Sequence, residues 1–199
     1  RDPSIEKIVA LRPDLVLATG GVQREAVAQL EKVGVPVFVL DPHTVDGVLD
    51  SIRTVARLAE VTAAGERLAE SLKRRIDAVR SRTAGLLEDA RPAVFYEVWP
   101  DKLRTAGPGS FIHDLIELAG GRNVAAGTGS PYPEFSVESL VAADPAVIIT
   151  PFEQSARDLA EGRRPGWQGI RAVREGRVVV VDQDLVSRPG PRLVDGLEA

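Results

Sequence analysis

A repeated unit is the feature of this sequence that most constrains its fold. Residues 4–19 (SIEKIVALRPDLVLAT) match residues 136–151 (SVESLVAADPAVIITP) in register at serine, glutamate, valine, alanine and proline. Each copy opens with a serine suited to cap a helix and a glutamate in the first turn, where the helix dipole favours it. A proline then ends the helix, and the aliphatic residues that follow predict a strand buried on both faces.

A second apolar strand follows each copy after another helical segment. These strands are expected in residues 35–41 (VPVFVLD) and residues 177–184 (RVVVVDQD), and both runs end in aspartate. Buried strands that alternate with helices indicate parallel sheets with helices on both faces. The sequence therefore predicts an α/β fold with two lobes.

Between the two copies lies a long amphipathic segment. Leu68, Leu72, Ile76, Val79 and Leu86 recur at helical spacing, and charged residues occupy the other positions. The pattern predicts one long helix that joins the lobes.

The predicted organisation is an N-terminal lobe in residues 1–61, a linking helix in residues 62–89 and a C-terminal lobe in residues 90–199. The first lobe has only two clear strands, which is a thin sheet. We therefore expect the first lobe to be truncated at its N-terminus, with an exposed sheet edge or pairing with a second chain.

Composition excludes several classes of protein. With 44% hydrophobic residues, the 199-residue chain can build a core, and its net charge of −4 offers no continuous basic surface for nucleic acid. The chain has no cysteine, which excludes disulfides, thiolate metal ligands and cysteine nucleophiles. No apolar run approaches the roughly 20 residues of a membrane span.

The segments that follow the strands are where a ligand site is expected, because ligands of open α/β sheets lie outside the carboxyl ends of the strands. These segments are rich in glycine, proline and aromatic residues. Trp99 follows a strand end directly and precedes Pro100, so we expect it to contact a ligand. Trp167 precedes a short helix and is expected to pack in the core.

Motifs for catalysis are missing from these segments. The stretch GPGS at residues 107–110 lacks the third glycine of a dinucleotide fingerprint, and the chain has neither a phosphate-binding P-loop nor a nucleophile elbow. Ser110 is instead a good helix cap after a tight glycine turn. His43 and His113 are the only histidines, a poor start for a metal site, so no metal is predicted.

Four segments together resemble one family. Residues 4–19, 97–124 (EVWPDKLRTAGPGSFIHDLIELAGGRNV), 131–150 and 184–199 look like the helical-backbone, or class III, substrate-binding proteins of ABC importers, and most closely the cobalamin-binding branch. The resemblance covers essentially the whole chain. It implies two α/β lobes joined by one long helix, with the ligand in the cleft between them. It also implies that the sequences of the family normally begin some tens of residues before the position that matches residue 1.

The same resemblance implies a non-catalytic role without a cofactor. The protein would capture cobalamin or a related corrinoid in the inter-lobe cleft and deliver it to an ABC transporter permease. It would be periplasmic or extracellular, either free or tethered by a lipid anchor to the cytoplasmic membrane. Aromatic faces suit a flat macrocycle, and backbone and polar groups suit its amides.

Carried over residue by residue, the resemblance implies a set of ligand contacts. Tyr132 stands where cobalamin binders often have tryptophan, so the identity of the ligand stays open. The implied ligand contacts are Thr19, Gly20, Gly21, Asp41, Trp99, Thr105, Gly107, Tyr132, Pro133, Phe152, Asp184, Leu185 and Arg188.

The family also docks on its permease through one exposed acidic residue on each lobe. Glu25 is the candidate in the first lobe, although the closest alignment places Arg24 there. In the second lobe the expected acid falls on Ser187, and Asp184 or Asp195 is a substitute. Solvated surface charges are an equally good interpretation of these acids.

Two alternatives stay open. A ferric siderophore or haem could be the ligand instead, and a haem binder would need an axial ligand such as Tyr132, Tyr96 or His43. The other alternative is an α/β enzyme that uses carboxylates such as Glu97 and Asp101, although nothing in the sequence orients a nucleophile or base toward them.

Overall fold

The computed structural model describes residues 4–21 and 23–199, and the chain forms two compact units, Arg1–Pro42 and His43–Ala199. The predicted lobe boundary near Val61 differs from this division by one helix, α3 (Val45–Leu58), which belongs to the second unit. The assignment of lobes around Val61 therefore stays a prediction.

The first unit has the predicted order of helix, strand, helix and strand. Its elements are α1 (Ile5–Ala10), β1 (Val16–Thr19), α2 (Arg24–Lys32) and β2 (Val37–Leu40). The strands β1 and β2 pair in parallel, with Val16 opposite Val37 and Thr19 opposite Leu40. Because parallel strands run in the same direction, both carboxyl ends lie at one edge of this two-stranded sheet.

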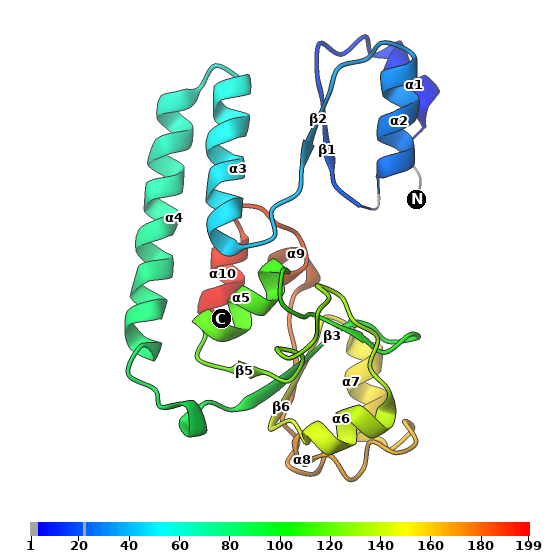
Figure 1. Ribbon diagram of the computed structural model, residues 1–199, viewed down its shortest axis with the longest axis vertical. Helices are drawn as coiled ribbons and strands as arrows, with labels where there is room; N and C mark the ends of the chain where they lie inside the picture. Colours follow the sequence, from blue (N-terminus) through cyan, green and yellow to red (C-terminus); the bar gives the residue numbers. More distant parts are fainter. Residues whose placement is uncertain (1–3, 22) are drawn as a thin grey trace. The chain divides into compact units, whose positions relative to one another are not determined.

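The second unit is built on a five-stranded sheet (Figure 1). The elements of this unit are α3, α4 (Thr62–Thr83), the 3₁₀ helix η1 (Glu88–Ala90), β3 (Ala93–Trp99), β4 (Arg104–Thr105), α5 (Phe111–Leu118), β5 (Arg122–Asn123), α6 (Val137–Ala143), β6 (Val147–Thr150), α7 (Glu153–Ala160), α8 (Arg171–Arg174), β7 (Val178–Val180), α9 (Gln183–Val186) and α10 (Leu193–Glu198). The order of strands in the sheet is β4, β3, β6 and β7, and β5 also pairs with β3. Each of these pairings is parallel except that of β3 with β4.

Successive residues of the central strand β3 pack into two different hydrophobic clusters. Val94 and Tyr96 belong to a cluster with residues of α3, α4, α5 and α10, whereas Phe95 packs with residues of α6, α7 and α8. This alternation follows from the period of two in a strand. Helices therefore cover both faces of the sheet, which confirms the predicted α/β class.

The sequence repeat corresponds to a structural repeat. Ser4 and Ser136 each cap their helix by accepting a hydrogen bond from the backbone N–H three residues later. The residues before the two prolines, Arg12 and Asp144, both have a left-handed backbone, with φ of 47° and 39°. Since such a conformation is uncommon outside glycine, its recurrence at matching positions shows that the backbone turns in the same way before both prolines.

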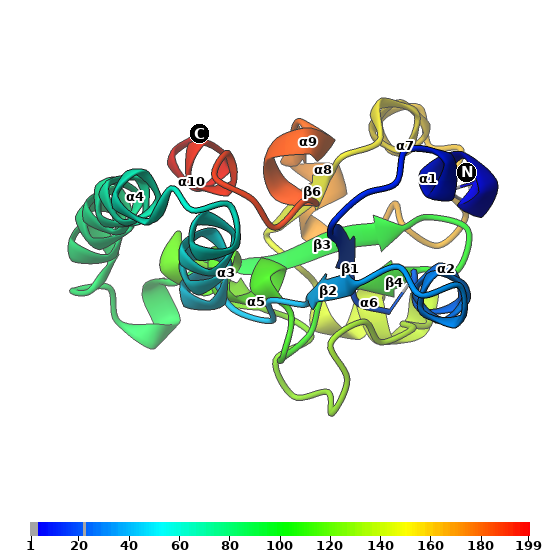
Figure 2. The ribbon, with the colours of Figure 1, turned by 90° about the horizontal axis from the view of Figure 1, so that it is seen from above.

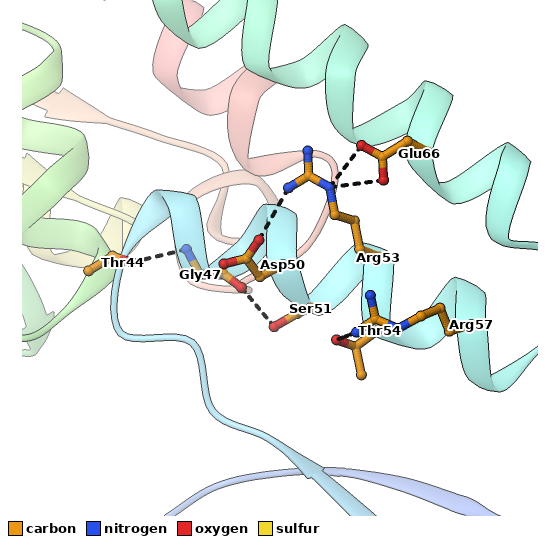
Figure 3. A network of polar contacts seen from close by, with 8 residues as sticks. All are labelled: Thr44, Gly47, Asp50, Ser51, Arg53, Thr54, Arg57 and Glu66. Atoms are coloured by element: carbon orange, nitrogen blue, oxygen red, sulfur yellow. Dashed lines mark hydrogen bonds and ion pairs between the residues drawn. The ribbon is translucent and has the colours of Figure 1, made fainter.

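Helices α3 and α4 lie side by side as an antiparallel pair in Figures 1 and 2. A Cβ atom on Gly65 of α4 would lie 2.1 Å from the Cβ of Ala56 on α3, so this close approach requires glycine. Figure 3 shows the polar link between them, in which Arg53 Nε lies 3.1 Å from both carboxylate oxygens of Glu66. The packing of α3 on α4 explains why α3 belongs to the second unit.

Helix α4 is shorter than the predicted linking helix of residues 62–89 and ends at Thr83. The Thr83 hydroxyl lies 2.9 Å from the backbone carbonyl of Leu118 on α5, which ties the end of α4 to the second unit. Leu72, Ile76 and Val79 are buried as predicted, whereas Leu68 and Leu86 are exposed. The role of α4 as a link between two lobes stays a prediction.

Candidate functional site

The carboxyl ends of β3, β6 and β7 meet at one edge of the second unit's sheet, because these three strands are parallel neighbours. Trp99 is the last residue of β3 and its exposed fraction is 56%. Phe152 follows β6 as the residue before α7, and Leu185 lies in α9 after β7. We call this edge the strand-end surface of residues 43–199.

A loop that carries Tyr132 packs beside β4 at this edge. The backbone N–H of Thr105 donates to the carbonyl of Pro133 (3.1 Å), and that of Gly107 donates to Pro131 (2.9 Å). Tyr132 itself is 40% exposed. Tyr132 is therefore exposed at the surface, and two backbone hydrogen bonds hold its loop against Thr105 and Gly107.

Thr105 and Gly107 lie beneath this loop rather than at the surface. Thr105 has an exposed fraction of 0%, and Gly107 is buried. A Cβ on Gly107 would lie 2.3 Å from the backbone oxygen of Ser130, so this glycine is required by the chain's own loop. In this structure both residues support the loop that carries Tyr132, and their direct contact with a ligand stays a prediction.

The hydroxyl of Thr105 is a buried polar atom that finds no hydrogen-bond partner among the described residues. Such an atom carries a desolvation cost of about 1–3 kcal/mol. The hydroxyl of Ser110, in contrast, has hydrogen-bond partners. It donates to the Gly107 carbonyl (2.8 Å) and accepts from the His113 N–H (3.2 Å), which confirms the predicted role of Ser110 as a helix cap.

Beneath the strand-end surface lies a buried polar network that sequence reasoning missed. Glu97 of β3 has an exposed fraction of 0%, and its carboxylate accepts hydrogen bonds from Arg164 and from the Thr150 hydroxyl, the latter at 2.8 Å. The guanidinium of Arg164 also lies 4.7 Å from the ring centroid of Trp167. A carboxylate in the apolar run FYEVW was a signal that a partner exists, although not which residue it is.

This network removes the geometric basis for an enzyme that uses Glu97. Both carboxylate oxygens are engaged and the side chain is only 1% exposed, so the group cannot reach a substrate without rearrangement. The second carboxylate of that alternative, Asp101, lies in the exposed turn after β3.

Asp184 and Arg188 form an ion pair on and just after α9. Arg188 Nε lies 2.9 Å from Asp184 Oδ1, and Arg192 lies 3.9 Å from the other carboxylate oxygen. The Arg188 side chain is 72% exposed, so the pair is solvated and contributes little to stability. It is available for polar contacts with a ligand.

In the first unit, the predicted residues also gather at strand ends. Thr19 ends β1, and its backbone N–H donates to Gln23 Oε1 at 2.7 Å. A Cβ on Gly20 would lie 2.2 Å from Asp41 Oδ2, which shows that the two strand ends touch. Gly21 has a φ of +68°, a left-handed conformation that favours glycine.

The two candidate docking acids differ in their surroundings. Glu25 is exposed in the first turn of α2 and lies 3.4 Å from the side-chain amide of Gln29. Asp195 of α10 lies 2.7 Å from Arg75 of α4, and Glu198 pairs with the same guanidinium. Hydrogen bonds to Glu198 and then to Asp195 raise the pKa of Arg75 above its ordinary value, so Asp195 already has a cationic partner.

Ser187 lies at the position where the family resemblance implies a docking acid. Its hydroxyl is 3.2 Å from the hydroxyl of Tyr96, which is only 3% exposed. Burial raises the pKa of Tyr96 to about 12, so its phenolate form is disfavoured. Tyr96 is buried in this structure, whereas Tyr132 and His43, the other candidates for an axial ligand of haem, are exposed.

A groove of about 390 Å³ in the second unit is lined by none of the predicted ligand residues. It is lined by the start of α3, the end of α4 and α5, with Arg80, Arg91, Asp114 and Glu117 among its charged residues. Burial raises the pKa of the Asp114 carboxyl, and the hydrogen bond that it accepts from the Val45 N–H opposes this shift.

The described residues form neither a metal-binding cluster nor a membrane-spanning helix. Among residues 4–21 and 23–199, no group of three or more histidine, aspartate or glutamate side chains is placed to hold a metal ion. Over the same residues, each helix is too short or too polar to span a bilayer.

Comparison with known proteins places the chain in a family. A family model described as periplasmic binding protein matches residues 1–185, so the chain belongs to the periplasmic binding protein family. This is a family of binding proteins and not of enzymes.

Two curated relatives match almost the whole chain. An uncharacterised ABC transporter substrate-binding lipoprotein of Bacillus subtilis is 31% identical over 201 residues, and a cobalamin-binding protein of Halobacterium salinarum is 33% identical over 199 residues. They cover 98% and 96% of this chain, which spans only 63% and 53% of their respective lengths.

Three solved structures share the fold. The periplasmic vitamin B12 binding protein of Vibrio cholerae has a TM-score of 0.81 at 28% identity, covering 100% of this chain and 77% of that chain. A periplasmic heme-binding protein of Roseiflexus sp. RS-1 gives 0.83 at 28% identity, with 99% and 77% covered. A protein of the Fe3+-hydroxamate transport system of Saccharomonospora viridis gives 0.81 at 29% identity, with 100% and 71% covered.

Proposed function

We propose that this chain is the substrate-binding component of an ABC importer and that it binds cobalamin or a related corrinoid outside the cytoplasmic membrane. The observation that carries the proposal is Trp99, a large aromatic residue more than half exposed at the carboxyl end of a central strand. Exposed aromatic residues at such an edge offer a flat apolar surface to a macrocycle. The family match and the relatives with cobalamin-binding names support the same function.

The proposed contacts divide into surface residues and supporting residues. Thr105 and Gly107 are proposed to be supporting residues, because they hold the loop that carries Tyr132. The proposed surface contacts in residues 43–199 are Trp99, Tyr132, Pro133, Phe152, Asp184, Leu185 and Arg188. On the first unit they are Thr19, Gly20, Gly21 and Asp41.

Delivery to a permease is part of the proposal. Glu25 is proposed to meet a cationic residue of the permease, because it is an exposed acid at the start of a helix. Asp195 is the proposed second contact, and it would share or exchange its partner Arg75 on docking. Attachment by a lipid anchor and pairing of the β1–β2 sheet with another strand stay predictions.

A ferric siderophore or haem is the second candidate ligand. It is favoured by the haem-binding and hydroxamate-transport names of two proteins with this fold, and for haem also by Tyr132, an exposed phenol of the kind that serves as an axial ligand of haem iron. The two candidates differ in what they require from Tyr132. A corrinoid needs the ring face, whereas axial ligation of haem iron needs the hydroxyl oxygen.

A fluorescence titration distinguishes the candidates. Trp99 and Trp167 are the only tryptophans, so in a Trp167→Phe background the emission comes from Trp99 alone. The protein, with any native sequence that precedes residue 1, is titrated with cyanocobalamin, haem and a ferric hydroxamate. Tyr132→Phe is the diagnostic variant, because it keeps the ring and removes the hydroxyl.

We expect saturable quenching by cyanocobalamin at micromolar concentration or below, with similar affinity in Tyr132→Phe. The Trp99→Phe variant with Trp167 retained controls for light absorption by the ligand, since Trp167 is buried. Two results would favour the second candidate and reject the first, each without binding of cyanocobalamin: haem binding that Tyr132→Phe weakens, or tight binding of the ferric hydroxamate.

A further inference from the structure

Glu97 is a buried carboxylate directly below the proposed ligand surface. It lies two residues before Trp99 in β3, and its side chain is 1% exposed. Removing a charged carboxylate from water costs several kcal/mol unless partners replace the water. Arg164 donates to Oε1 and the Thr150 hydroxyl donates to Oε2, so both oxygens are satisfied.

The hydroxyl of Thr150 connects this carboxylate to the turn after β6. Thr150 is the last residue of β6 and is fully buried. Its single proton goes to Glu97 Oε2, which leaves the oxygen lone pairs as acceptors, and the Phe152 backbone N–H donates to that oxygen at 3.1 Å. A continuous chain of hydrogen bonds therefore runs from Arg164 through Glu97 and Thr150 to the Phe152 backbone.

Arg164 closes the other end of the network. Its guanidinium lies 4.7 Å from the centroid of the Trp167 ring, and the ring itself is packed edge-on against Phe95, with centroids 6.1 Å apart. The Arg164 side chain is 17% exposed, and its backbone carbonyl accepts from the side-chain amide of Gln168 at 3.0 Å. The Trp167 ring and Gln168 thus help to hold Arg164 in place, in addition to the Glu97 carboxylate.

We propose that Glu97, Thr150 and Arg164 are positioning residues of the strand-end surface. They hold the Phe152 backbone and the end of β3 that carries Trp99 in one arrangement before a ligand arrives. Because the surface is ordered in advance, binding loses less conformational entropy and the ligand is held more tightly. This inference rests on the proposed function, since it assigns a role to residues that do not touch the ligand.

A positioning role and a purely structural role of this network predict different effects of a substitution. If the network only stabilised the fold, its loss would lower the melting temperature, and a fully folded variant would bind ligand normally. If the network positions the surface, a variant that is still folded loses affinity and its Phe152 N–H exchanges faster. Hydrogen exchange of that amide is measured without any ligand.

The test compares three threonine substitutions at temperatures well below their melting points. Thr150→Val removes the hydroxyl and both of its hydrogen bonds at nearly constant size, and Thr150→Ser retains the hydroxyl. Thr83→Val is the matched control, because it also removes a hydrogen-bonded hydroxyl from the same unit, but at the end of α4. Glu97→Gln is the second variant of the network, since an amide cannot replace the charge that faces Arg164.

We expect Thr150→Val to raise the exchange rate of the Phe152 amide at least tenfold and to weaken ligand binding about tenfold. Glu97→Gln shifts both quantities in the same direction. Thr150→Ser is expected to remain within about twofold of the wild type, and so is Thr83→Val despite its lower stability. The loss of affinity in a folded Thr150→Val variant, together with its recovery in Thr150→Ser, is the result that a merely structural account does not predict.

Unchanged Phe152 exchange in folded Thr150→Val overturns the proposal, and so does wild-type affinity in both network variants. If the wild type binds none of cyanocobalamin, haem and the ferric hydroxamate, the proposed function fails separately. The Phe152 exchange rates then decide whether the network positions this surface: faster exchange with rescue by serine supports it, and equal rates reject it.

Discussion

Gly107 shows how one residue sets the shape of the candidate site. The loop of residues 128–133 packs so closely on it that a side chain would meet the Ser130 backbone oxygen at 2.3 Å and Thr128 Oγ1 at 2.7 Å. A backbone atom cannot move aside as a flexible side chain can. The loop that presents Tyr132 therefore depends on the absence of a Cβ at this position.

Gly107→Ala is expected to lower the free energy of unfolding by about 1–3 kcal/mol, the usual range for overpacking. Urea denaturation followed by circular dichroism measures this change. Gly129→Ala is the matched control, because nothing lies within 4 Å of a Cβ at that position on the same loop. Equal stability of the two variants would contradict the packing role of Gly107.

Thr105 provides the second prediction for a single residue. Its hydroxyl is buried without a partner among the described residues, so Thr105→Val removes the cost of burying it. We expect the free energy of unfolding to rise by about 1 kcal/mol, or about 2–4 °C in Tm for a chain of this size. Ligand affinity is expected to stay within about twofold, since Thr105 is 0% exposed. A tenfold loss of affinity would show that Thr105 contacts the ligand after all.

At the scale of elements, the start of α3 is held by α5. Asp114 Oδ2 accepts a hydrogen bond from the Val45 N–H at 3.1 Å, and Val45 is the first residue of α3. A carboxylate near a helix N-terminus is favoured by the helix dipole, but burial acts against its charged form. The net effect is a raised pKa, with burial as the largest cause.

The raised pKa of Asp114 predicts how stability depends on pH. A carboxyl whose pKa is higher in the folded state contributes stability below its unfolded pKa of 3.8, and this contribution is lost as the pH rises through the folded pKa. The melting temperature of Asp114→Asn should therefore increase relative to the wild type from pH 3.8 upward.

Glu198→Gln is the control of opposite sign for this pH series. Hydrogen bonding to Arg75 lowers the pKa of Glu198, so its contribution is present above the unfolded value of 4.5 and is lost as the pH falls. Relative to the wild type, this variant should become less stable as the pH rises. The same trend in both variants would contradict the opposite pKa shifts.

Much of the element pattern follows from local signals in the sequence. Ser4, Ser110 and Ser136 cap helices where their positions predict it, and Trp167 packs in the core. These features depend on a few neighbouring residues or on hydrophobic spacing. The end of α4 at Thr83 was not predictable in this way, because the Thr83 hydroxyl meets a carbonyl of α5, far along the chain.

The candidate site was predictable only in part for the same reason. The position of Trp99 at the end of a strand follows from a local signal, and its exposure agrees with a surface role. The partners of Glu97 were missed because Thr150 and Arg164 lie 53 and 67 residues away in sequence. The burial of Thr105 and Gly107 was missed because the loop of residues 128–133 covers them only in the folded chain.

At the scale of the whole molecule, one architecture occurs twice. In each unit, predicted ligand residues follow the carboxyl ends of parallel strands: Thr19 and Asp41 in the first unit, Trp99 and Phe152 in the second. In open α/β sheets, ligands bind outside the carboxyl ends of the strands, beside the segments that follow them. The family of periplasmic binding proteins, to which the chain belongs, agrees with a surface built for capture rather than for chemistry.

The central claim is that the strand-end surface around Trp99 binds a corrinoid, and calorimetric titration with cyanocobalamin tests it most directly. The protein, with any native sequence preceding residue 1, is compared with its Trp99→Ala variant under identical conditions. We predict a Kd in the micromolar range or below and at least a tenfold weaker Kd for the variant, equivalent to about 1.4 kcal/mol. No binding heat from the wild type, or equal Kd values for both proteins, would contradict the claim.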